Sequence, residues 1–350
     1  MPPPPQGSVK IKTVNLALQG GGAHGAFAWG ILDKLLEDGR LDVEGLSATS
    51  AGTMNALAFA QGMTESGKDG AREKLENFWR EISKEGDIYS PVRGMPFDRM
   101  TGIGNGENPF GYFMFDTLTR IFSPYQFNPF DINPLKDVLE RCIDFDVLQS
   151  CECMKLFISA TNVKTGKVKV FKTQDVTLDV ALASGCLPFL FKAVEIDGQH
   201  YWDGGYMGNP ALYPLFYDTK SSDIVLINLN PIERDEVPTT APEIMNRVNE
   251  ISFNSSLLKE LRAIGFVKRL IEEDIIKDEY KKDFKDLLIH PVRADGAMKD
   301  YSVASKFDTD WGFLTELRDL GREKMSDWFD EFYDNIGVRS SVDLREEFLD

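Results

Sequence analysis

A glycine-rich segment, residues 19–25, combines residue types that can stabilise negative charge. It reads Gln-Gly-Gly-Gly-Ala-His-Gly and lies between an apolar run and a helical pattern. Glycines allow close backbone approach and let several N–H groups point at one spot beside a helix N-terminus, which suits an anion or a developing oxyanion. The spacing also matches Gly-x-Gly-x-x-Gly of dinucleotide sites, and a plain tight turn would use similar residues. The segment alone does not distinguish an anion or oxyanion site from a dinucleotide site or from a plain tight turn.

A second segment, Ala48-Thr49-Ser50-Ala51-Gly52, has the composition of a nucleophile elbow. Such a turn is so sharp that the positions two before and two after the serine must be small. Gly52 meets this requirement fully, and Ala48 meets it with one extra methyl group. Ser50 would then lie at a helix N-terminus, where the Ala51 N–H and the helix dipole favour negative charge. A serine that only caps the helix fits the same pattern equally well.

A third segment, Asp203-Gly204-Gly205, follows a strand of a predicted hairpin. An aspartate followed by two glycines is a common turn, so taken alone this segment indicates nothing more. A hairpin is also a rigid arm that can hold a carboxylate against a distant serine. A carboxylate becomes a competent base when it is partly desolvated and hydrogen-bonded to the hydroxyl.

The chain contains only three histidines, which restricts the choice of base for a reactive serine. His290 lies in or beside an apolar strand and is interpreted as structural, and His200 is expected to pack or cap. His24 is the only one near the glycine-rich segment, where its charge would depend on pH around 6.5. A serine–aspartate pair is therefore the simpler assignment.

The elements predicted around these segments alternate between strands and helices. Strand, turn and helix recur twice within the first 62 residues, which predicts parallel strands in an α/β fold. Predicted strands cover residues 14–18, 45–49, 155–161, 168–171, 194–196, 199–202, 223–228 and 287–290, and predicted helices cover 26–36, 51–62, 72–85, 175–184, 243–271 and 314–336.

The domain organisation follows from these elements. Residues 1–11 are predicted to be a disordered tail, 12–215 a catalytic core, and 216–350 strands and helices that complete the same domain. Within the core, residues 89–130 are rich in aromatic side chains and glycine but poor in regular patterns. Such a segment is typical of a lid or pocket-lining insertion, although a small aromatic core under a loop would look the same.

Composition limits the partners and the compartment. The 39 basic and 56 acidic side chains among 350 residues give a net charge of −17, which disfavours nucleic-acid binding. No run of apolar residues is long enough for a spanning helix, and the first eight residues lack the regions of a secretory leader. Four cysteines without metal-site spacing predict a cytoplasmic location, with no metal and no cofactor. Transient contact with a membrane surface and the oligomeric state are left open.

Taken together, the three segments resemble the patatin-like phospholipase family over roughly residues 12–215. Residues 183–189 also look like the stretch that precedes the aspartate hairpin of that family. The resemblance implies a three-layer α/β/α fold with a mainly parallel sheet, and lipid acyl-ester hydrolysis by a Ser/Asp dyad without histidine. It implies that Ser50 is the nucleophile and Asp203 the base. The implied oxyanion hole consists of Gly20, Gly21, Gly22 and Ala51. The remaining motif positions are Ala23, His24, Gly25, Ala48, Thr49, Gly52, Gly204 and Gly205.

Two positions depart from the family pattern. The usual glycine before the elbow is Ala48, and the usual basic residue after the glycines is His24. Two alternatives stay open at this point. One is a dinucleotide-binding Rossmann-type protein, although an acidic residue is missing from the end of the second predicted strand. The other is a non-catalytic lipid-binding relative. Phospholipase, lysophospholipase, acylglycerol lipase and polyester hydrolase activities all fit the same residues.

Overall fold

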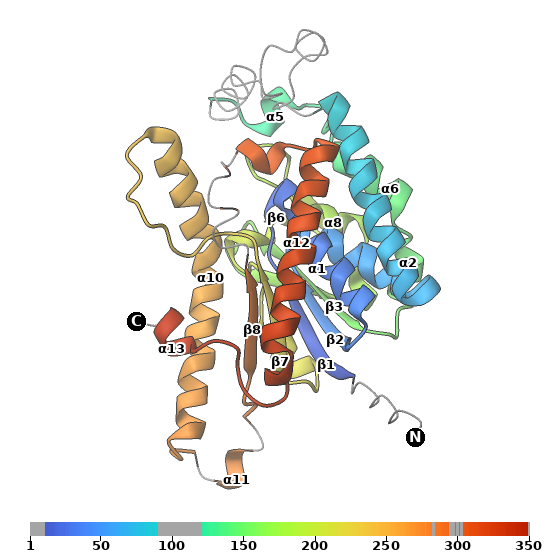
Figure 1. Ribbon diagram of the computed structural model, residues 1–350. Helices are drawn as coiled ribbons and strands as arrows, with labels where there is room; N and C mark the ends of the chain where they lie inside the picture. The colour runs from blue at the N-terminus through green and yellow to red at the C-terminus, as the bar shows by residue number, and fades with distance from the viewer. Residues whose placement is uncertain are drawn as a thin grey trace.

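A mainly parallel sheet forms the centre of the computed structural model (Figure 1). The structure describes residues 11–89, 121–276, 278–281, 284–293, 298, 301 and 304–348. The sheet order is β5-β6-β3-β2-β1-β7-β8, and β4 pairs with β3. Antiparallel pairing is confined to β3, β4, β5 and β6 within this sheet. The strands are β1 (Lys12–Leu18), β2 (Leu41–Ala48), β3 (Lys155–Asn162), β4 (Val168–Lys172), β5 (Val194–Ile196), β6 (Gln199–Asp203), β7 (Asp223–Asn228) and β8 (Leu288–Arg293).

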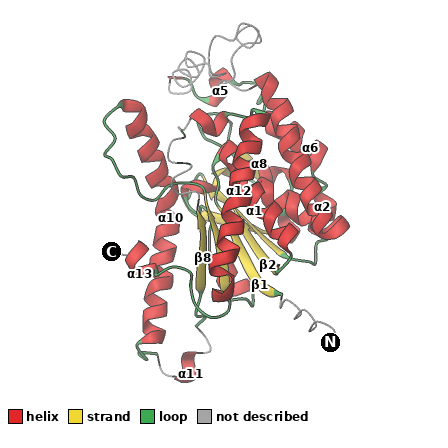
Figure 2. Ribbon diagram, in the orientation of Figure 1, coloured by secondary structure: helices red, strands yellow, loops and turns green. Residues whose placement is uncertain are grey.

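Helices cover both faces of the sheet, as Figure 2 shows. The α-helices are α1 (Gly25–Asp38), α2 (Ala51–Tyr89), α5 (Pro124–Phe127), α6 (Pro134–Cys142), α7 (Phe145–Gln149), α8 (Leu178–Ser184), α9 (Tyr213–Asp218), α10 (Ala241–Glu272), α11 (Asp278–Lys281), α12 (Trp311–Phe332) and α13 (Leu344–Phe348). One core layer packs α1, α2 and α12 against the sheet, and a second packs α9, α10 and α13 on the other face. The predicted three-layer α/β/α arrangement is confirmed.

The central strand β1 explains why the sheet is covered on both faces. Val14, Leu16 and Leu18 point into the first core layer, while Ala17 points into the second. A parallel strand with apolar residues on both sides must be enclosed by helices on both sides. The carboxyl ends of β1 and β2 lie side by side in register, with Leu18 opposite Ala48. The glycine-rich segment and the elbow that follow these two strands therefore start at the same edge.

Helix α12 in the C-terminal part belongs to the core because it contacts α1 closely. A Cβ atom on Gly30 would overlap the carbonyl of Arg318, and one on Gly321 would overlap the carbonyl of Phe27. Glycines at these two positions allow the two helix backbones to approach each other directly. Among the described helices, none is long and apolar enough to cross a membrane.

Several differences from the sequence-based expectations concern irregular segments. The two helices expected at 51–62 and 72–85 both lie within α2 but extend further, and a kink with non-helical angles at Ser66 and Gly67 separates them. Helices α6, α7 and α9 were not predicted, because at 9, 5 and 6 residues each is shorter than the window in which a helical period is recognised. The expected tail at 1–11 lies outside the described residues except for its last position, and so do residues 90–120 of the expected insertion.

Candidate active site

The glycine-rich segment is held at its start by buried side-chain amides. Gln19 Oε1 accepts hydrogen bonds from the N–H groups of Leu229 (2.8 Å) and Asn230 (3.0 Å), which follow β7. The N–H of Gly20 donates to Asn209 Oδ1 at 2.7 Å. Because this N–H is already bonded, Gly20 is not a donor for an oxyanion in this arrangement. The candidate donors are thereby narrowed to Gly21, Gly22 and Ala51.

The middle of the loop adopts a backbone conformation that requires glycine. Gly22 has φ +60°, and a Cβ atom there would overlap the carbonyl oxygen of Lys306. Lys306 belongs to the short 3₁₀ helix η4 (Ala304–Phe307). The loop is therefore covered directly by a segment from the C-terminal part of the chain, and a larger residue at position 22 would displace it.

Ser50 lies at the sharp turn between β2 and α2. Its φ of 54° is in the left-handed region, which is strained for a residue with a side chain. The turn is tight enough that a Cβ atom on Gly52 would overlap the carbonyl of Leu18, and one on Gly20 would come within 2.6 Å of Ser50 Cβ. Ala48 is fully buried in the first core layer, so its methyl group fits within the core beside this turn. This backbone has the form of a nucleophile elbow.

Hydrogen bonds to α8 and to the loop that contains Gly208 support the elbow. Ser184 Oγ, at the end of α8, accepts from the Ser50 N–H at 3.0 Å. The same hydroxyl is 2.8 Å from Thr53 Oγ1. Thr49 Oγ1 donates to the carbonyl of Gly208 at 2.6 Å. These contacts hold Ser50 from both sides. A strained backbone conformation persists only when its surroundings support it in this way.

Asp203 ends β6 with its carboxyl group fully buried. Its backbone is held by the Cys186 carbonyl, which accepts from its N–H at 2.8 Å, and by Thr161 Oγ1, which donates to its carbonyl at 2.8 Å. Oδ1 accepts the Gly205 N–H at 2.7 Å. Oδ2 has no hydrogen-bond partner among the described residues, so no direct hydrogen bond joins it to Ser50 in this structure.

The environment of Asp203 raises its pKa to about 6. Burial is the main cause, because removing a carboxylate from water disfavours the charged form. The Gly205 N–H, the nearby Ser50 hydroxyl and the charge of Lys306 act in the opposite direction. A carboxyl with this pKa is ionised at neutral pH and is still basic enough to accept a proton.

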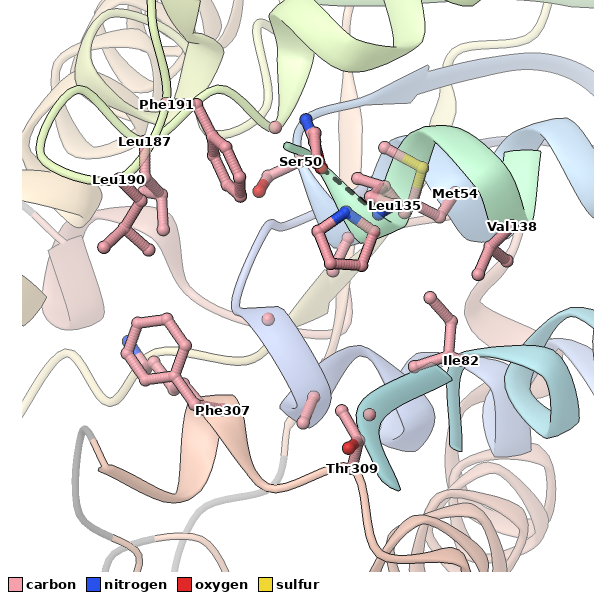
Figure 3. Close-up of a pocket in the computed structure, with 18 of the residues that line it drawn as sticks. Ser50, Met54, Ile82, Leu135, Val138, Leu187, Leu190, Phe191, Phe307 and Thr309 are labelled. Atoms are coloured by element: carbon pink, nitrogen blue, oxygen red, sulfur yellow. Dashed lines mark hydrogen bonds between the residues drawn. The ribbon is translucent and has the colours of Figure 1, made fainter. Parts of the chain in front are cut away.

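Ser50 and Asp203 line the same cavity of about 530 Å³. Figure 3 shows Ser50 facing this cavity, with Leu187, Leu190 and Phe191 on one side of it. Met54, Leu135, Val138 and Ile82 form the opposite side, and Phe307 and Thr309 lie across from Ser50. Gly21, Gly22 and Ala51 also line it. The arrangement places a strained serine, a buried carboxylate and backbone donors in a mainly apolar chamber.

The expectation for His24 is wrong. His24 is buried, its ring is 2.8 Å from Ser305 Oγ, and it packs against Tyr301 and Phe313. Burial and the charge of Lys306 lower its pKa to about 3. The imidazole is therefore neutral across the physiological range and supplies no pH-dependent charge near pH 6.5.

His290 is structural, as interpreted. Its ring is hydrogen-bonded to Asp223 (2.9 Å) and Ser341 (2.7 Å) and stands edge-on to Trp328. It is fully buried and does not line the cavity that contains Ser50.

Sequence reasoning missed the residues that support the site from outside its motifs. Ser184 lies in the recognised 183–189 stretch, but only the structure shows that it bonds the elbow. Asn209 follows Gly204-Gly205 closely, yet nothing in the pattern indicates that its amide bonds Gly20. Lys306 had no sequence signal, because it lies in an irregular segment far from the other motifs.

Comparison with models of known protein families identifies the family of this chain. The model of the patatin-like phospholipase family matches residues 16–216, which is more than half of the chain. The chain belongs to the patatin-like phospholipase family. No curated protein matches the sequence.

Two solved structures are similar to this chain. VipD from Legionella pneumophila is 14% identical, with a TM-score of 0.40 over 97% of this chain and 73% of that one. ExoU, in a heterodimeric complex with SpcU from the type III secretion system of Pseudomonas aeruginosa, is 15% identical with a TM-score of 0.38. That match covers 92% of this chain and 52% of the other, so this chain spans about half the length of ExoU.

Proposed function

We propose that the chain hydrolyses carboxyl esters of lipids, with Ser50 as the nucleophile and Asp203 as the general base. The observation that carries the proposal is that both side chains line one mainly apolar cavity. A chamber of this size and polarity suits an acyl chain better than a dinucleotide, whose phosphates and riboses need many polar partners. Membership of the patatin-like phospholipase family supports the same substrate class.

The first half of the reaction forms an acyl-enzyme. Ser50 transfers its proton to Asp203 as its Oγ bonds to the ester carbonyl carbon. The N–H groups of Gly21, Gly22 and Ala51 stabilise the tetrahedral oxyanion, and each such donor is worth about 10²–10³ in kcat. The bond to the alcohol oxygen then breaks, and Asp203 returns the proton to this leaving group.

The second half releases the fatty acid. A water molecule gives its proton to Asp203 and attacks the acyl carbonyl carbon, which forms a second oxyanion at the same donors. The bond between this carbon and Ser50 Oγ then breaks, and Asp203 returns the proton to the serine. One ester and one water become one alcohol and one fatty acid.

The test is to replace each member of the pair. Ser50→Ala and Asp203→Asn should each lower kcat on short-chain nitrophenyl esters and on phospholipid vesicles by about 10³-fold or more. Ser150→Ala, an exposed serine that does not line the cavity, is the matched control and should retain activity. Full turnover in Ser50→Ala or in Asp203→Asn would refute the proposed mechanism.

A further inference from the structure

Lys306 is the only cationic side chain among the described residues that line the cavity. The other charged residues in that lining are Asp203 and Glu85. Glu85 is paired with Arg141 at 2.7 Å, so its charge is already compensated. Burying a single ammonium in a mainly apolar chamber costs free energy unless the ammonium is paired or hydrogen-bonded.

Among the described residues, the Lys306 ammonium makes hydrogen bonds only with neutral groups. Nζ donates to Asn230 Oδ1 at 2.9 Å and to Asn249 Oδ1 at 3.3 Å, and both acceptors are neutral. Among the described residues, no carboxylate lies within 4.0 Å of it. Glu250 is near enough to act on its pKa but is itself paired with Arg234 (2.5 Å) and Arg247 (3.1 Å). An ammonium has three donors, so one is available to a ligand.

The backbone of Lys306 lies beside Gly22, one of the candidate oxyanion donors. Its carbonyl lies directly against Gly22, where it leaves no room for a Cβ atom. The Asn249 amide and the Phe253 ring of α10 hold the other end of the side chain, with Nζ 6.0 Å from the ring centroid. Lys306 therefore contacts the glycine-rich segment through its backbone and α10 through its ammonium group.

We propose that Lys306 binds the phosphate of a phospholipid headgroup and so makes the enzyme prefer phospholipids to neutral acylglycerols. The inference rests on the proposed function, because it assumes that the ester carbonyl is held at Ser50. In a phospholipid, the phosphate is only a few bonds from the acyl esters, so an ester at Ser50 brings it near a cation that lines the same cavity. Lysine is a common point-charge ligand for phosphate.

The protonation of Lys306 makes this preference sensitive to pH. Burial lowers its pKa to about 8, the nearby Arg234 acts in the same direction, and Glu250 and Asp203 act against both. His24 is another ionisable neighbour of Lys306, and it is neutral. The ammonium is thus charged at pH 7 and loses its charge as the pH rises through about 8.

The experiment compares two esters with identical acyl groups, dihexanoylphosphatidylmethanol and dihexanoylglycerol, both kept monomeric. The measured quantity is the ratio of their kcat/KM values within each variant. An effect of Lys306 on Asp203, or on folding, changes both substrates alike and cancels in this ratio. Lys306→Met should lower the ratio by at least tenfold, and Lys306→Arg should retain much of it.

The matched control is Lys285→Met. Lys285 is also partly buried, donates only to neutral oxygens of Leu215 and Thr219, and has a lowered pKa, but it does not line the cavity. Its replacement should leave the ratio unchanged. In the wild-type protein, the ratio should also fall as the pH is raised from 7 to above 8. This measurement does not depend on any variant folding.

The outcomes separate the inference from the function on which it rests. If Ser50→Ala is inactive but the ratio is the same in Lys306→Met and wild type, phosphate binding is refuted and the hydrolase survives. A ratio that stays constant across pH 8 refutes it as well. If the wild type hydrolyses neither ester, both proposals fail. A final measurement adds inorganic phosphate to the wild-type protein with dihexanoylglycerol as the substrate. If a low concentration of phosphate inhibits this hydrolysis, and the ratio of the two kcat/KM values is the same in Lys306→Met as in wild type, the cavity contains a site for free phosphate and the headgroup proposal is refuted.

Discussion

At the scale of single residues, the pKa of Asp203 is set by opposing effects that bring it close to neutral pH. Full burial raises its pKa, while one backbone N–H, a hydroxyl and the charge of Lys306 lower it, with a result of about 6. An aspartate in water has a pKa of about 3.9 and would be a poor base. The surroundings of Asp203 therefore make a dyad without histidine chemically reasonable.

This balance predicts the pH dependence of the reaction. Below pH 6 Asp203 is protonated and cannot accept the proton of Ser50, so kcat/KM on a neutral short-chain ester should fall about tenfold per pH unit there. Lys306→Met should move this acid limb to higher pH, because the positive charge that favours the carboxylate is removed. If kcat/KM of the wild type began to fall only near pH 4, the burial assigned to Asp203 as the base would be contradicted.

The sequence predicts the chemical residues of the site better than their electrostatics. Ser50 and Asp203 stand in motifs whose local geometry is dictated by neighbouring glycines, so their types and places can be read directly. The charge near the glycine-rich segment cannot be read in this way. His24 looks like its source in the sequence but is buried and neutral, whereas Lys306 arrives from an irregular segment through tertiary contacts.

At the scale of elements, two segments that carry exposed apolar side chains also contribute to the lining of the cavity. Residues 121–132, which include α5, contribute Phe127 and Ile132 to the cavity lining, and the segment after α8 contributes Leu187 and Phe191. The two segments are linked by a hydrogen bond from Lys192 Nζ to the Pro129 carbonyl at 2.8 Å. The exposed apolar side chains here are Ile121, Phe122, Tyr125, Phe127, Phe130, Ile132 and Phe189.

Exposed apolar side chains beside a cavity that could hold a lipid predict that the protein contacts a membrane surface through residues 121–132 and Phe189. Phe130 is 87% exposed and Phe189 is 65% exposed. The double variant Phe130→Glu/Phe189→Glu should lower the rate on phospholipid vesicles by about tenfold or more and leave monomeric esters nearly unaffected. Tyr217→Glu on α9, which replaces another highly exposed aromatic residue, is the control. Equal loss on vesicles and monomers would contradict this membrane role.

Elements with strong periodicity were predictable, and those set by tertiary packing were not. Strand β7 was predicted with its observed bounds because Ile224–Ile227 is a continuous apolar run flanked by Asp223 and Asn228. Helix α9 was missed, since Tyr213–Asp218 is too short to show a helical period. The break between the two predicted helices within α2 was predictable, and the structure places it at Ser66 and Gly67, where Gly67 has a non-helical φ of +67°.

At the scale of the whole molecule, the C-terminal part closes the site and completes the core. Helix α12 packs on α1, and η4 covers the glycine-rich segment just before α12 begins. The contact between α1 and α12 depends on Gly30 and Gly321, where the backbones meet. The position of Lys306 therefore depends on the packing of a helix that the family match over residues 16–216 does not include.

Gly321→Ala tests this packing. The added methyl group overlaps the Phe27 carbonyl, so the helices must separate, and the free energy of unfolding should fall by about 1–3 kcal/mol. Glu323→Ala, an exposed site on the same helix, should change it little. Chemical denaturation measures both, and an unchanged midpoint in Gly321→Ala would mean that the contact contributes no stability.

The most direct test of the central claim is to trap the covalent intermediate. Wild-type protein is incubated with a slowly hydrolysed long-chain nitrophenyl ester, quenched in acid, digested and examined by mass spectrometry. The account predicts that the acyl mass is found on Ser50, accumulates while nitrophenol is released, and is absent from Ser50→Ala. Nitrophenol release at the wild-type rate with no acyl group on Ser50, or with the acyl group on another residue, would contradict it.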